Sequence, residues 1–278
     1  MDKSFPELQQ AVASIARDTG DLVLDHYRNH DFTVADKEDH SPVTSADIEA
    51  SEFLTRALSK LTPDIPILSE EAIVPWQQRR DWQRYWLIDP IDGTQEFIDG
   101  SGDFAIAIAL IDRFQPVMGS IYWPTESVLY QGMQGHGAQR IAMPATGALS
   151  NSERIKVRRV ADPRSGELII AISRRQSQDK VSSRMNPARA VTPLVTGSCS
   201  LKSCLVAEGS ADCFLRVGPT GEWDTGAAQI IVEEAGGNLL SEHFQPITYN
   251  RTASLSNPNF MVLGDPRVDW MSVFPGAV

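Results

Sequence analysis

Two carboxylates lie three residues apart directly after an apolar run, and this pair is the strongest chemical signal in the chain. The run is Tyr85 to Ile88, and the segment that follows it reads Asp89-Pro90-Ile91-Asp92-Gly93-Thr94. Carboxylates crowded at the end of a buried strand repel each other unless a cation lies between them. Mg²⁺ takes oxygen ligands of this kind and keeps positions open for water and phosphate. Asp, Pro and Gly are also ordinary turn formers, so the segment alone fits either a metal site or a simple strand-to-helix turn.

Thr94 follows the two acids at a point where a helix can begin. The first N–H groups of a helix point out of its N-terminus and attract an anion. A metal ion, a phosphate group and a hydroxyl can therefore meet within this one segment. Phosphoryl transfer needs this kind of positioning and charge stabilisation more than it needs covalent chemistry.

Three further acidic positions fall at comparable points of the expected elements. Glu70 and Glu71 follow a short apolar strand expected at 67–68, much as Asp89 follows its own strand. Asp47 falls in the first turn of an expected helix, and Asp224 precedes a small-residue segment that leads into another. An acid early in a helix is often only a cap or a dipole partner. As a set, these acids match the ligands of a multi-metal phosphate site.

The spacing of apolar residues indicates the elements that must position these acids. It predicts helices over 8–23 and 45–61 and an antiparallel meander within 85–131. Strands and helices then alternate, which is typical of an α/β half. The expected elements there are strands at 168–172, 213–217 and 260–263 and helices at 200–207 and 225–235. The Gly-, Ala- and Pro-rich segment 132–150 separates the halves, so we expect an N-terminal α+β domain (1–145) carrying most metal ligands and a C-terminal α/β domain (146–278).

Composition limits the class of protein and its partners. The 278 residues are 42% hydrophobic and 22% charged, as in ordinary soluble globular proteins. The formal net charge of −11 argues against nucleic acid or an anionic membrane surface as a partner. The stretch from Arg154 to Arg189 differs, with ten basic residues against three acidic ones. It is either a solvated face or a patch that attracts a multiply charged anion.

The chain shows no sign of export or membrane insertion. No apolar run reaches membrane-spanning length, and the first residues lack the basic and then apolar layout of a secretion signal. We therefore expect a cytoplasmic location. Cys199, Cys204 and Cys213 cannot all pair and none belongs to a CxxC arrangement, so we expect reduced packing residues. No His and acid arrangement accompanies them, which argues against a thiol nucleophile.

Three segments together resemble the lithium-sensitive, Mg²⁺-dependent phosphatases of the inositol monophosphatase superfamily. They occur in that family's order and at about its spacing, and they are Leu68 to Glu71, Asp89 to Thr94 and Trp223 to Ala228. Two more segments, Gly197 to Gly209 and Gly218 to Asp224, resemble the bacterial 3′(2′),5′-bisphosphate nucleotidases of the CysQ type. The resemblance runs from about residue 5 to about residue 265.

This resemblance implies the fold and the reaction. The fold would be the sugar-phosphatase type, combining α+β and α/β parts in αβαβα layers, with the site between two domains. The activity would be a Mg²⁺-dependent hydrolysis of adenosine 3′,5′-bisphosphate to AMP and phosphate by a metal-activated water, with 3′-phosphoadenylyl sulfate as a second candidate substrate. The cellular role would be to clear a by-product of sulfate assimilation. The alternatives are an inositol or fructose phosphatase on the same scaffold and a catalytically inactive binding protein.

The family pattern also assigns metal ligands. It places Glu70, Asp89 and the backbone carbonyl of Ile91 on a first ion. Asp89 would bridge to a second ion, which Asp92 and Asp224 also hold. A third, weaker ion would rely on Glu70 and water, which gives two to three Mg²⁺ per site. Lithium inhibition is expected from the same resemblance.

Catalytic and substrate-binding residues follow from the same pattern. A hydrogen-bonded pair, Thr94 and Asp47, would orient and deprotonate the attacking water, and Glu70 is the third expected catalytic residue. Ser173 and Arg174 are additional candidates for nucleotide contact. The expected substrate contacts are Ile91, Asp92, Gly93, Thr94, Gly197, Ser198, Lys202 and Asp224. The substrate would be a small nucleotide bisphosphate, and the protein a monomer or homodimer, with peripheral association with the inner membrane left open.

The chain departs from the family pattern at a few positions. Ala105 and Ala107 stand where small polar residues are usual, and Gln176 stands where a histidine is expected. Gly226 and Ala228 exchange the usual order of alanine and glycine. No expected metal ligand is lost, so these departures bear on substrate contacts rather than on the chemistry.

Overall fold

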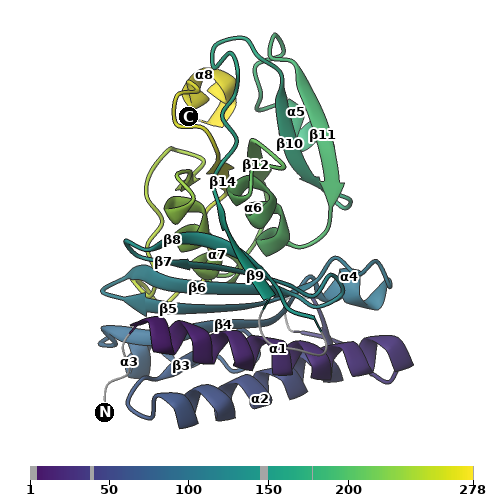
Figure 1. The fold of residues 1–278 in the computed structure, drawn as a ribbon, viewed down its shortest axis with the longest axis vertical. Coiled ribbons are helices and arrows are strands. Elements are labelled where there is room, and N and C mark those ends of the chain that lie inside the picture. Colours follow the sequence, from purple (N-terminus) through teal and green to yellow (C-terminus); the bar gives the residue numbers. More distant parts are fainter. Residues whose placement is uncertain (1–4, 38–40, 145–149, 177, 278) are drawn as a thin grey trace.

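Two β-sheets with helices on both sides of each make up the molecule (Figure 1). The computed structural model describes residues 5–37, 41–144, 150–176 and 178–277. Helices α1 (Phe5–Asn29) and α2 (Ser45–Leu61) cover the outer face of the first sheet. Helices α6 (Cys199–Ala207) and α7 (Trp223–Glu234) lie between the two sheets, and α5 (Gln178–Ser182) and α8 (Trp270–Val273) lie beyond the second sheet. The expected αβαβα layering is therefore confirmed.

The first sheet has seven strands in the order β3-β4-β5-β6-β7-β8-β9. Strand β3 is parallel to β4, and the remaining neighbours are antiparallel, so the expected meander is present. It also extends further along the chain than expected, because the segment predicted as a domain junction contains β8. The strands are β3 (Ile67–Ser69), β4 (Arg84–Asp92), β5 (Ala105–Asp112), β6 (Gln115–Trp123), β7 (Val128–Met133), β8 (Gly137–Ala142) and β9 (Ser150–Ile155).

The second sheet has five strands in the order β11-β10-β12-β14-β13. Strand β10 is parallel to β11 and β12, and β14 is antiparallel to β12 and β13. The expected strands correspond to β10 (Leu168–Ser173), β12 (Cys213–Arg216) and β14 (Phe260–Leu263). The sequence did not predict β11 (Val191–Thr196) and β13 (Asn238–Ser241). Strand β9 belongs to the first sheet, and the division into 1–145 and 146–278 stays a prediction.

Three short elements complete the fold near the first sheet. A two-stranded ribbon joins β1 (Val34–Asp36) to β2 (Pro42–Thr44), directly before α2. Helix α3 (Trp76–Arg79) lies between β3 and β4, and α4 (Thr94–Ile98) follows β4 at once. None of the described helices combines the length and apolar character required to cross a membrane.

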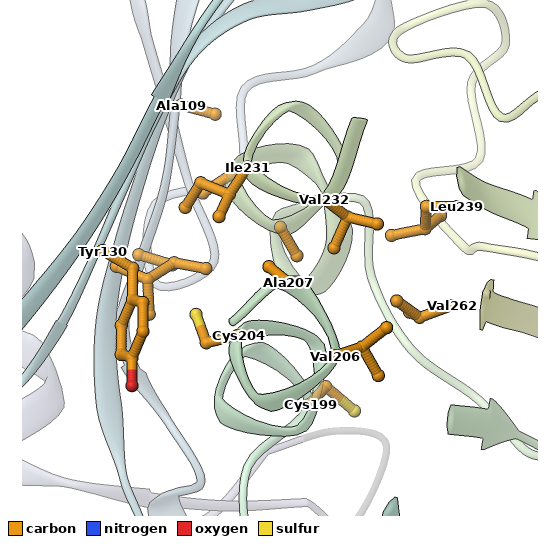
Figure 2. Packing of buried hydrophobic residues seen from close by; sticks show 14 of the residues in the cluster. Ala109, Tyr130, Cys199, Cys204, Val206, Ala207, Ile231, Val232, Leu239 and Val262 are labelled. Carbon is orange, nitrogen blue, oxygen red and sulfur yellow. The ribbon is translucent and has the colours of Figure 1, made fainter. Parts of the chain in front are cut away.

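Helix α7 joins the two sheets because it is apolar nearly all round. Residues on every side of it are buried, as expected for a helix that packs between two layers. Figure 2 shows Ile231 directed toward the first sheet and Val232 toward Leu239 and Val262 of the second. Complete burial of a side chain such as Ile231 stabilises the fold by about 1.5–3 kcal/mol.

Two glycines of the first sheet let α7 approach closely. A Cβ built on Gly119 of β6 would lie 2.5 Å from the carbonyl oxygen of Ala227, and one on Gly132 of β7 would lie 2.7 Å from Cα of Ile231. Both distances are too short for real atoms, so only glycine fits. The helix backbone therefore rests directly on the strand backbone.

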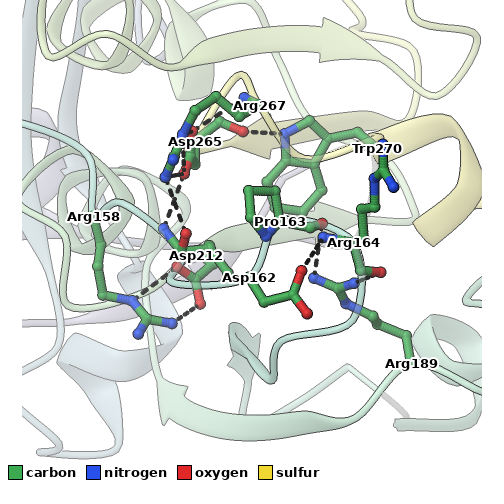
Figure 3. Close-up of polar contacts among 10 residues, drawn as sticks. Arg158, Asp162, Pro163, Arg164, Arg189, Asp212, Asp265, Arg267 and Trp270 are labelled. Carbon is green, nitrogen blue, oxygen red and sulfur yellow. Dashed lines mark hydrogen bonds and ion pairs between the residues drawn. The ribbon is translucent and has the colours of Figure 1, made fainter.

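Ion pairs and hydrogen bonds fix the segment between β9 of the first sheet and β10 of the second (Figure 3). Arg158 donates to both carboxylate oxygens of the buried Asp212. Asp265 accepts a hydrogen bond of 2.9 Å from the N–H of Val160, and Arg267 donates to the same carboxylate. The hydrogen bonds from Arg267 hold the pKa of Asp265 down at about 2. The linking segment is thus anchored to the second sheet by charge.

Candidate active site

Glu70 and Asp89 meet because β3 and β4 are parallel neighbours. Ser69, the last residue of β3, is paired with Ile88, so Glu70 and Asp89 come next to each other. The strand expected to end before Asp89 continues through it, since β4 extends to Asp92. The N–H of Glu70 donates a hydrogen bond of 3.2 Å to the carbonyl of Ile88. Burial and the neighbouring carboxylates of Glu70, Asp92 and Asp224 raise the pKa of Asp89 well above its usual range. The two strand ends therefore concentrate negative charge in a buried place.

A β-bulge brings Asp89 and Asp92 to the same face of the sheet. Asp89 lies opposite Ala107 and Asp92 lies opposite Ala105, with a register shift between the two pairs. Three residues along one strand therefore match two along the other, and the extra residue offsets the alternation of side chains. Ala105 and Ala107 are buried in the core shared with α6 and α7. These two alanines, which differ from the family pattern, therefore lie beside the acids on the face of the sheet that packs against α6 and α7.

Thr94 and Asp47 form the expected hydrogen-bonded pair. Gly93 has a left-handed φ of 102°, which turns the chain sharply out of β4 so that α4 begins at Thr94. The Thr94 hydroxyl donates a hydrogen bond of 2.9 Å to Oδ1 of Asp47. Oδ2 of Asp47 accepts from the N–H and the hydroxyl of Thr44, which closes a capping box at the start of α2. Burial raises the pKa of Asp47, and these hydrogen bonds oppose that shift.

Asp92 connects the first sheet to α6. Its carboxylate accepts hydrogen bonds from the Ser198 hydroxyl at 2.6 Å, from the N–H of Ser200 at 2.5 Å and from the N–H of Cys199 at 3.3 Å. A carboxylate at the N-terminus of a helix is favoured by the unpaired N–H groups and by the helix dipole. Asp92 is thus held in place by the second half of the chain.

Asp224 reaches the same place from the first turn of α7. One oxygen each of Asp92 and Asp224 and the sulfur of Cys199 lie within 4.8 Å of one another. Burial and the charges of Asp92 and Glu70 raise the pKa of Asp224 well above its usual range. Burial also raises the pKa of Cys199 to about 12, so this thiol stays protonated at neutral pH. All three cysteines are free and buried, as expected.

Lys37 is a member of the site that the sequence did not predict. Its ammonium lies 2.6 Å from the carboxylate of Glu70 and 2.7 Å from that of Glu71. Burial, followed by the charge of Glu70, raises the pKa of Glu71 to about 7, and Lys37 opposes this shift. Lys37 stands in a polar stretch without periodicity, so no pattern marks it. Glu71 thus shares one ammonium group with Glu70.

The residues predicted to contact the nucleotide form a tight loop before α6. The N–H of Gly197 donates to Asp103 at 2.8 Å, and a Cβ on Gly197 would lie 2.4 Å from Glu96. Ser198 has a positive φ of 49° and caps α6 by accepting from the N–H of Leu201. Lys202 is buried, and its ammonium donates to the carbonyls of Gly197 and Ser198. This lysine therefore supports the loop from behind, while its role as a substrate contact stays a prediction.

Part of the basic stretch is used in ion pairs. Arg174 lies 2.6 Å from Asp103, and Arg184 pairs with Glu242. Arg175 contacts Asp99 and lies 3.4 Å from Glu96 on the other half of the chain. Gln176, in place of the expected histidine, donates to the carbonyl of Leu215 at 3.2 Å.

A cleft of about 440 Å³ opens beside the acids. Asp89, Asp47 and Ile91 lie beneath its surface, since they are buried and do not line it. Its wall contains both acidic and basic side chains together with the start of α4. The lining residues include Glu70, Asp92, Thr94, Arg175, Gln176, Lys180, Ser198, Cys199, Lys202, Arg216, Pro219 and Asp224.

The carboxylates fit divalent cations. Four of them converge from the adjacent strands β3 and β4 and from the start of α7, and burial together with neighbouring carboxylates raises the pKa of Glu70, Asp89 and Asp224. A cation between them would reverse this effect and hold the acids ionised. Hard oxygen donors without histidine suit Mg²⁺ better than Zn²⁺. The four acids are Glu70, Asp89, Asp92 and Asp224.

The fold and this arrangement of acids define a class of phosphate-handling protein. The chain matches the sequence model of the inositol monophosphatase family over residues 6–261 and belongs to that family. It is 40% identical over 268 residues to the 3′(2′),5′-bisphosphate nucleotidase CysQ of Aggregatibacter actinomycetemcomitans, covering 96% of each chain. It is 37% identical over 252 residues to CysQ of Escherichia coli K12, covering 90% of this chain and 97% of the relative.

A solved structure agrees with these matches. The crystal structure of CysQ from Bacteroides thetaiotaomicron superposes with a TM-score of 0.78 at 33% identity. The match covers 94% of this chain and 98% of the other. Nearly the whole length is therefore shared with these relatives, which agrees with the span of the resemblance found in the sequence.

Proposed function

We propose that this protein is a Mg²⁺-dependent 3′(2′),5′-bisphosphate nucleotidase that hydrolyses adenosine 3′,5′-bisphosphate to AMP and phosphate. The observation that carries the proposal is the convergence of Asp89, Asp92, Glu70 and Asp224 beside the Thr94–Asp47 pair. The names of relatives that share 37–40% identity over most of the chain support the substrate. Members of this family depend on metal ions.

The acids would hold two to three ions. Glu70, Asp89 and the carbonyl of Ile91 would bind one, Asp89, Asp92 and Asp224 a second, and Glu70 a weaker third. Bound divalent ions would lower the pKa of a water molecule bound to them and would neutralise charge on the phosphoryl group. The buried position of Asp89 strengthens such electrostatic interactions, because little water screens them.

Thr94 and Asp47 would manage the proton of the attacking water. The Thr94 hydroxyl gives its own proton to the hydrogen bond with Asp47, so its lone pairs remain free to accept from a water in the cleft. Asp47 can then receive a proton through Thr94, because burial raises its pKa. The N–H groups of Gly93 and Thr94, where α4 begins, would hold phosphate oxygens.

The biological setting is part of the same proposal. The enzyme would clear a by-product of sulfate assimilation in the cytoplasm, with 3′-phosphoadenylyl sulfate as a further substrate and with inhibition by lithium. A monomer or homodimer with peripheral contact to the inner membrane is compatible with this role. Each of these points is implied by the resemblance found in the sequence.

A substrate comparison tests the proposal. Phosphate release is measured with adenosine 3′,5′-bisphosphate and with inositol 1-phosphate, each in Mg²⁺ and in EDTA. We expect Mg²⁺-dependent turnover with at least a tenfold preference in kcat/KM for the nucleotide. A preference for inositol 1-phosphate or for fructose 1,6-bisphosphate would replace the nucleotidase with a sugar phosphatase. Binding without turnover of any ester would show an inactive binding protein.

A further inference from the structure

An arginine is completely buried between the first sheet and the loop that precedes β14. Arg79 is the last residue of α3, in the connection between β3 and β4, and only 1% of it is exposed. The proposed mechanism gives this residue no role. A buried charge is costly unless hydrogen bonds and an opposite charge compensate it. The groups that compensate Arg79 therefore indicate its function.

The guanidinium of Arg79 holds an irregular loop from the other half of the chain. Its terminal nitrogens donate to the side-chain oxygen of Asn250 at 2.5 Å and to the carbonyls of Thr252 at 3.2 Å and Ala253 at 2.6 Å. The amide nitrogen of Asn250 donates in return to the carbonyl of Arg79 at 2.7 Å. These acceptors belong to the loop 242–259, which the structure describes in full and which contains neither helix nor strand. The shape of the loop therefore depends on contacts of this kind.

The same loop holds the start of α7. The N–H of Asn250 donates to both carboxylate oxygens of Glu222, each at 2.9 Å, and Glu222 is the residue directly before α7. The N–H of Glu222 donates to the carbonyl of Leu255 at 2.8 Å. Glu222 is buried, and the charge of Arg79 acts on it. Asn250 thus joins two buried and opposite charges, one from each half of the chain.

The turn that orients Asp224 is held by this loop as well. The N–H of Gly221 donates to Oδ2 of Asp224 at 2.7 Å. Gly221 forms a β-bridge with Ser256, and its carbonyl accepts from the side chain of Asn257 at 2.5 Å. The carboxylate of Asp224 therefore takes its position from a turn that the loop fixes.

We propose that Arg79 is a positioning residue: by holding the loop 242–259 against the first sheet, it sets the place of Asp224 relative to Asp89 and Asp92. This inference rests on the proposed function, because it takes these three acids to be ligands of one ion. Groups that hold metal ligands from outside the coordination sphere strongly affect metal affinity. Arg79 does not line the cleft, so its effect reaches the ion through the start of α7.

Metal binding by the substrate-free protein provides the test. Calorimetry with Mn²⁺ compares the wild type with R79M, which keeps the apolar stem and removes every donor, and with R79K, which keeps the charge without the planar fork. We expect R79M to weaken Mn²⁺ binding by about 10-fold to 100-fold, the usual effect of removing a partner that supports a metal ligand. R79K should lie between R79M and the wild type.

Turnover at increasing Mg²⁺ concentration separates a positioning role from a loss of folded protein. If Asp224 is displaced, a higher Mg²⁺ concentration fills the weakened site. The Mg²⁺ concentration that gives half-maximal turnover should then rise in R79M, while kcat at saturating Mg²⁺ stays within about threefold of the wild type. A smaller folded fraction would instead lower kcat at every Mg²⁺ concentration.

Arg158 offers a matched control. Its guanidinium also holds a buried carboxylate, that of Asp212, but in the segment between β9 and β10. R158M should lower the Tm and leave Mn²⁺ affinity unchanged. N250G removes the side chain that Arg79 holds, and glycine accepts the left-handed φ of 51° at this position. It should weaken Mn²⁺ binding less than R79M does, and it decides the question if R79M does not fold.

Two results would overturn the inference. One is unchanged Mn²⁺ affinity in R79M and N250G, and the other is an equal loss of affinity in R158M. A wild-type preference for inositol 1-phosphate would overturn the proposed substrate instead. The Mn²⁺ comparison uses no substrate, so it would still decide the role of Arg79.

Discussion

The hydroxyl of Thr94 and the carboxylate of Asp47 are joined by a hydrogen bond of 2.9 Å, although the first belongs to α4 and the second to α2. The other oxygen of Asp47 is held by Thr44. The shorter of the two hydrogen bonds that the Thr94 hydroxyl can donate is thus the one to Asp47, since the carbonyl of Ile91 lies at 3.3 Å. A residue that caps one helix thus fixes the orientation of a hydroxyl at the start of another.

Removing the Thr94 hydroxyl should slow the reaction without affecting the metal ligands. We expect T94A to lower kcat by about 10²-fold to 10⁴-fold, the usual contribution of a positioned proton-transfer group. Mn²⁺ affinity, measured by calorimetry, should change by less than threefold. T94S keeps the hydroxyl and should recover most of the activity. A loss of metal binding in T94A equal to its loss of kcat would make Thr94 structural.

Asp89 should matter both for metal binding and for the stability of the metal-free protein. D89N should lower kcat/KM by about 10³-fold or more, because it weakens two ion sites. In EDTA the same variant should have a higher Tm than the wild type, because it removes a buried charge from among like charges. The increase in Tm that Mg²⁺ gives to the wild type should vanish. Asp64 is exposed and does not line the cleft, so D64N is the control. An unchanged Mg²⁺ effect in D89N would remove Asp89 from the ligands.

Lys37 should compete with a cation for Glu70. Its ammonium lies 2.6 Å from Glu70, so replacing it with the neutral K37Q leaves more negative charge for an ion. We expect tighter cation binding by about threefold to tenfold, and inhibition by lithium at correspondingly lower concentrations. K60Q, at the exposed end of α2, should show neither effect. Weaker cation binding in K37Q would mean that Lys37 orders Glu70 rather than competing for it.

The ion pair between Asp265 and Arg267 should stabilise the fold at neutral pH and contribute less in strong acid. Hydrogen bonds from Arg267 lower the pKa of Asp265 to about 2 in the folded protein, against about 3.9 when unfolded. A group with a lowered folded pKa stabilises the fold above the unfolded pKa, and this contribution disappears as the pH falls toward 2. The free energy of unfolding by urea should therefore be lower in D265N than in the wild type at pH 7, with a smaller difference at pH 2.5. An equal difference at both pH values would contradict the ionised pair.

The sequence predicted which acids converge, because most of their positions obey simple rules. Glu70 follows the end of β3, Asp89 follows the apolar part of β4, and these two strands are parallel neighbours. The bulge between Asp89 and Asp92 could not be foreseen, because register depends on pairing with β5. Without it, alternation would direct Asp92 to the opposite face. The structure therefore brings the expected acids together partly through a feature that the sequence does not show, and their role as metal ligands stays a prediction.

Other features carried weaker signals. Strand β11 is an edge strand with mostly exposed residues and a proline, so it lacks the alternation that marks a half-buried strand. Strand β8 lies in a segment whose glycines and alanines are typical of a linker. Lys37 had no signal, because only its contacts mark it.

The direct contact of α7 with Gly119 and Gly132 has a consequence for how this enzyme could be rebuilt. Two backbones in contact cannot relieve a clash by changing a side-chain rotamer. Even the methyl group of an alanine at either glycine would therefore force α7 away from the sheet. The position of α7, which carries Asp224, is therefore fixed relative to the first sheet, which carries Asp89 and Asp92. A chimera joining the first sheet of one relative to the second sheet of another would assemble its ligands only where both glycines are retained.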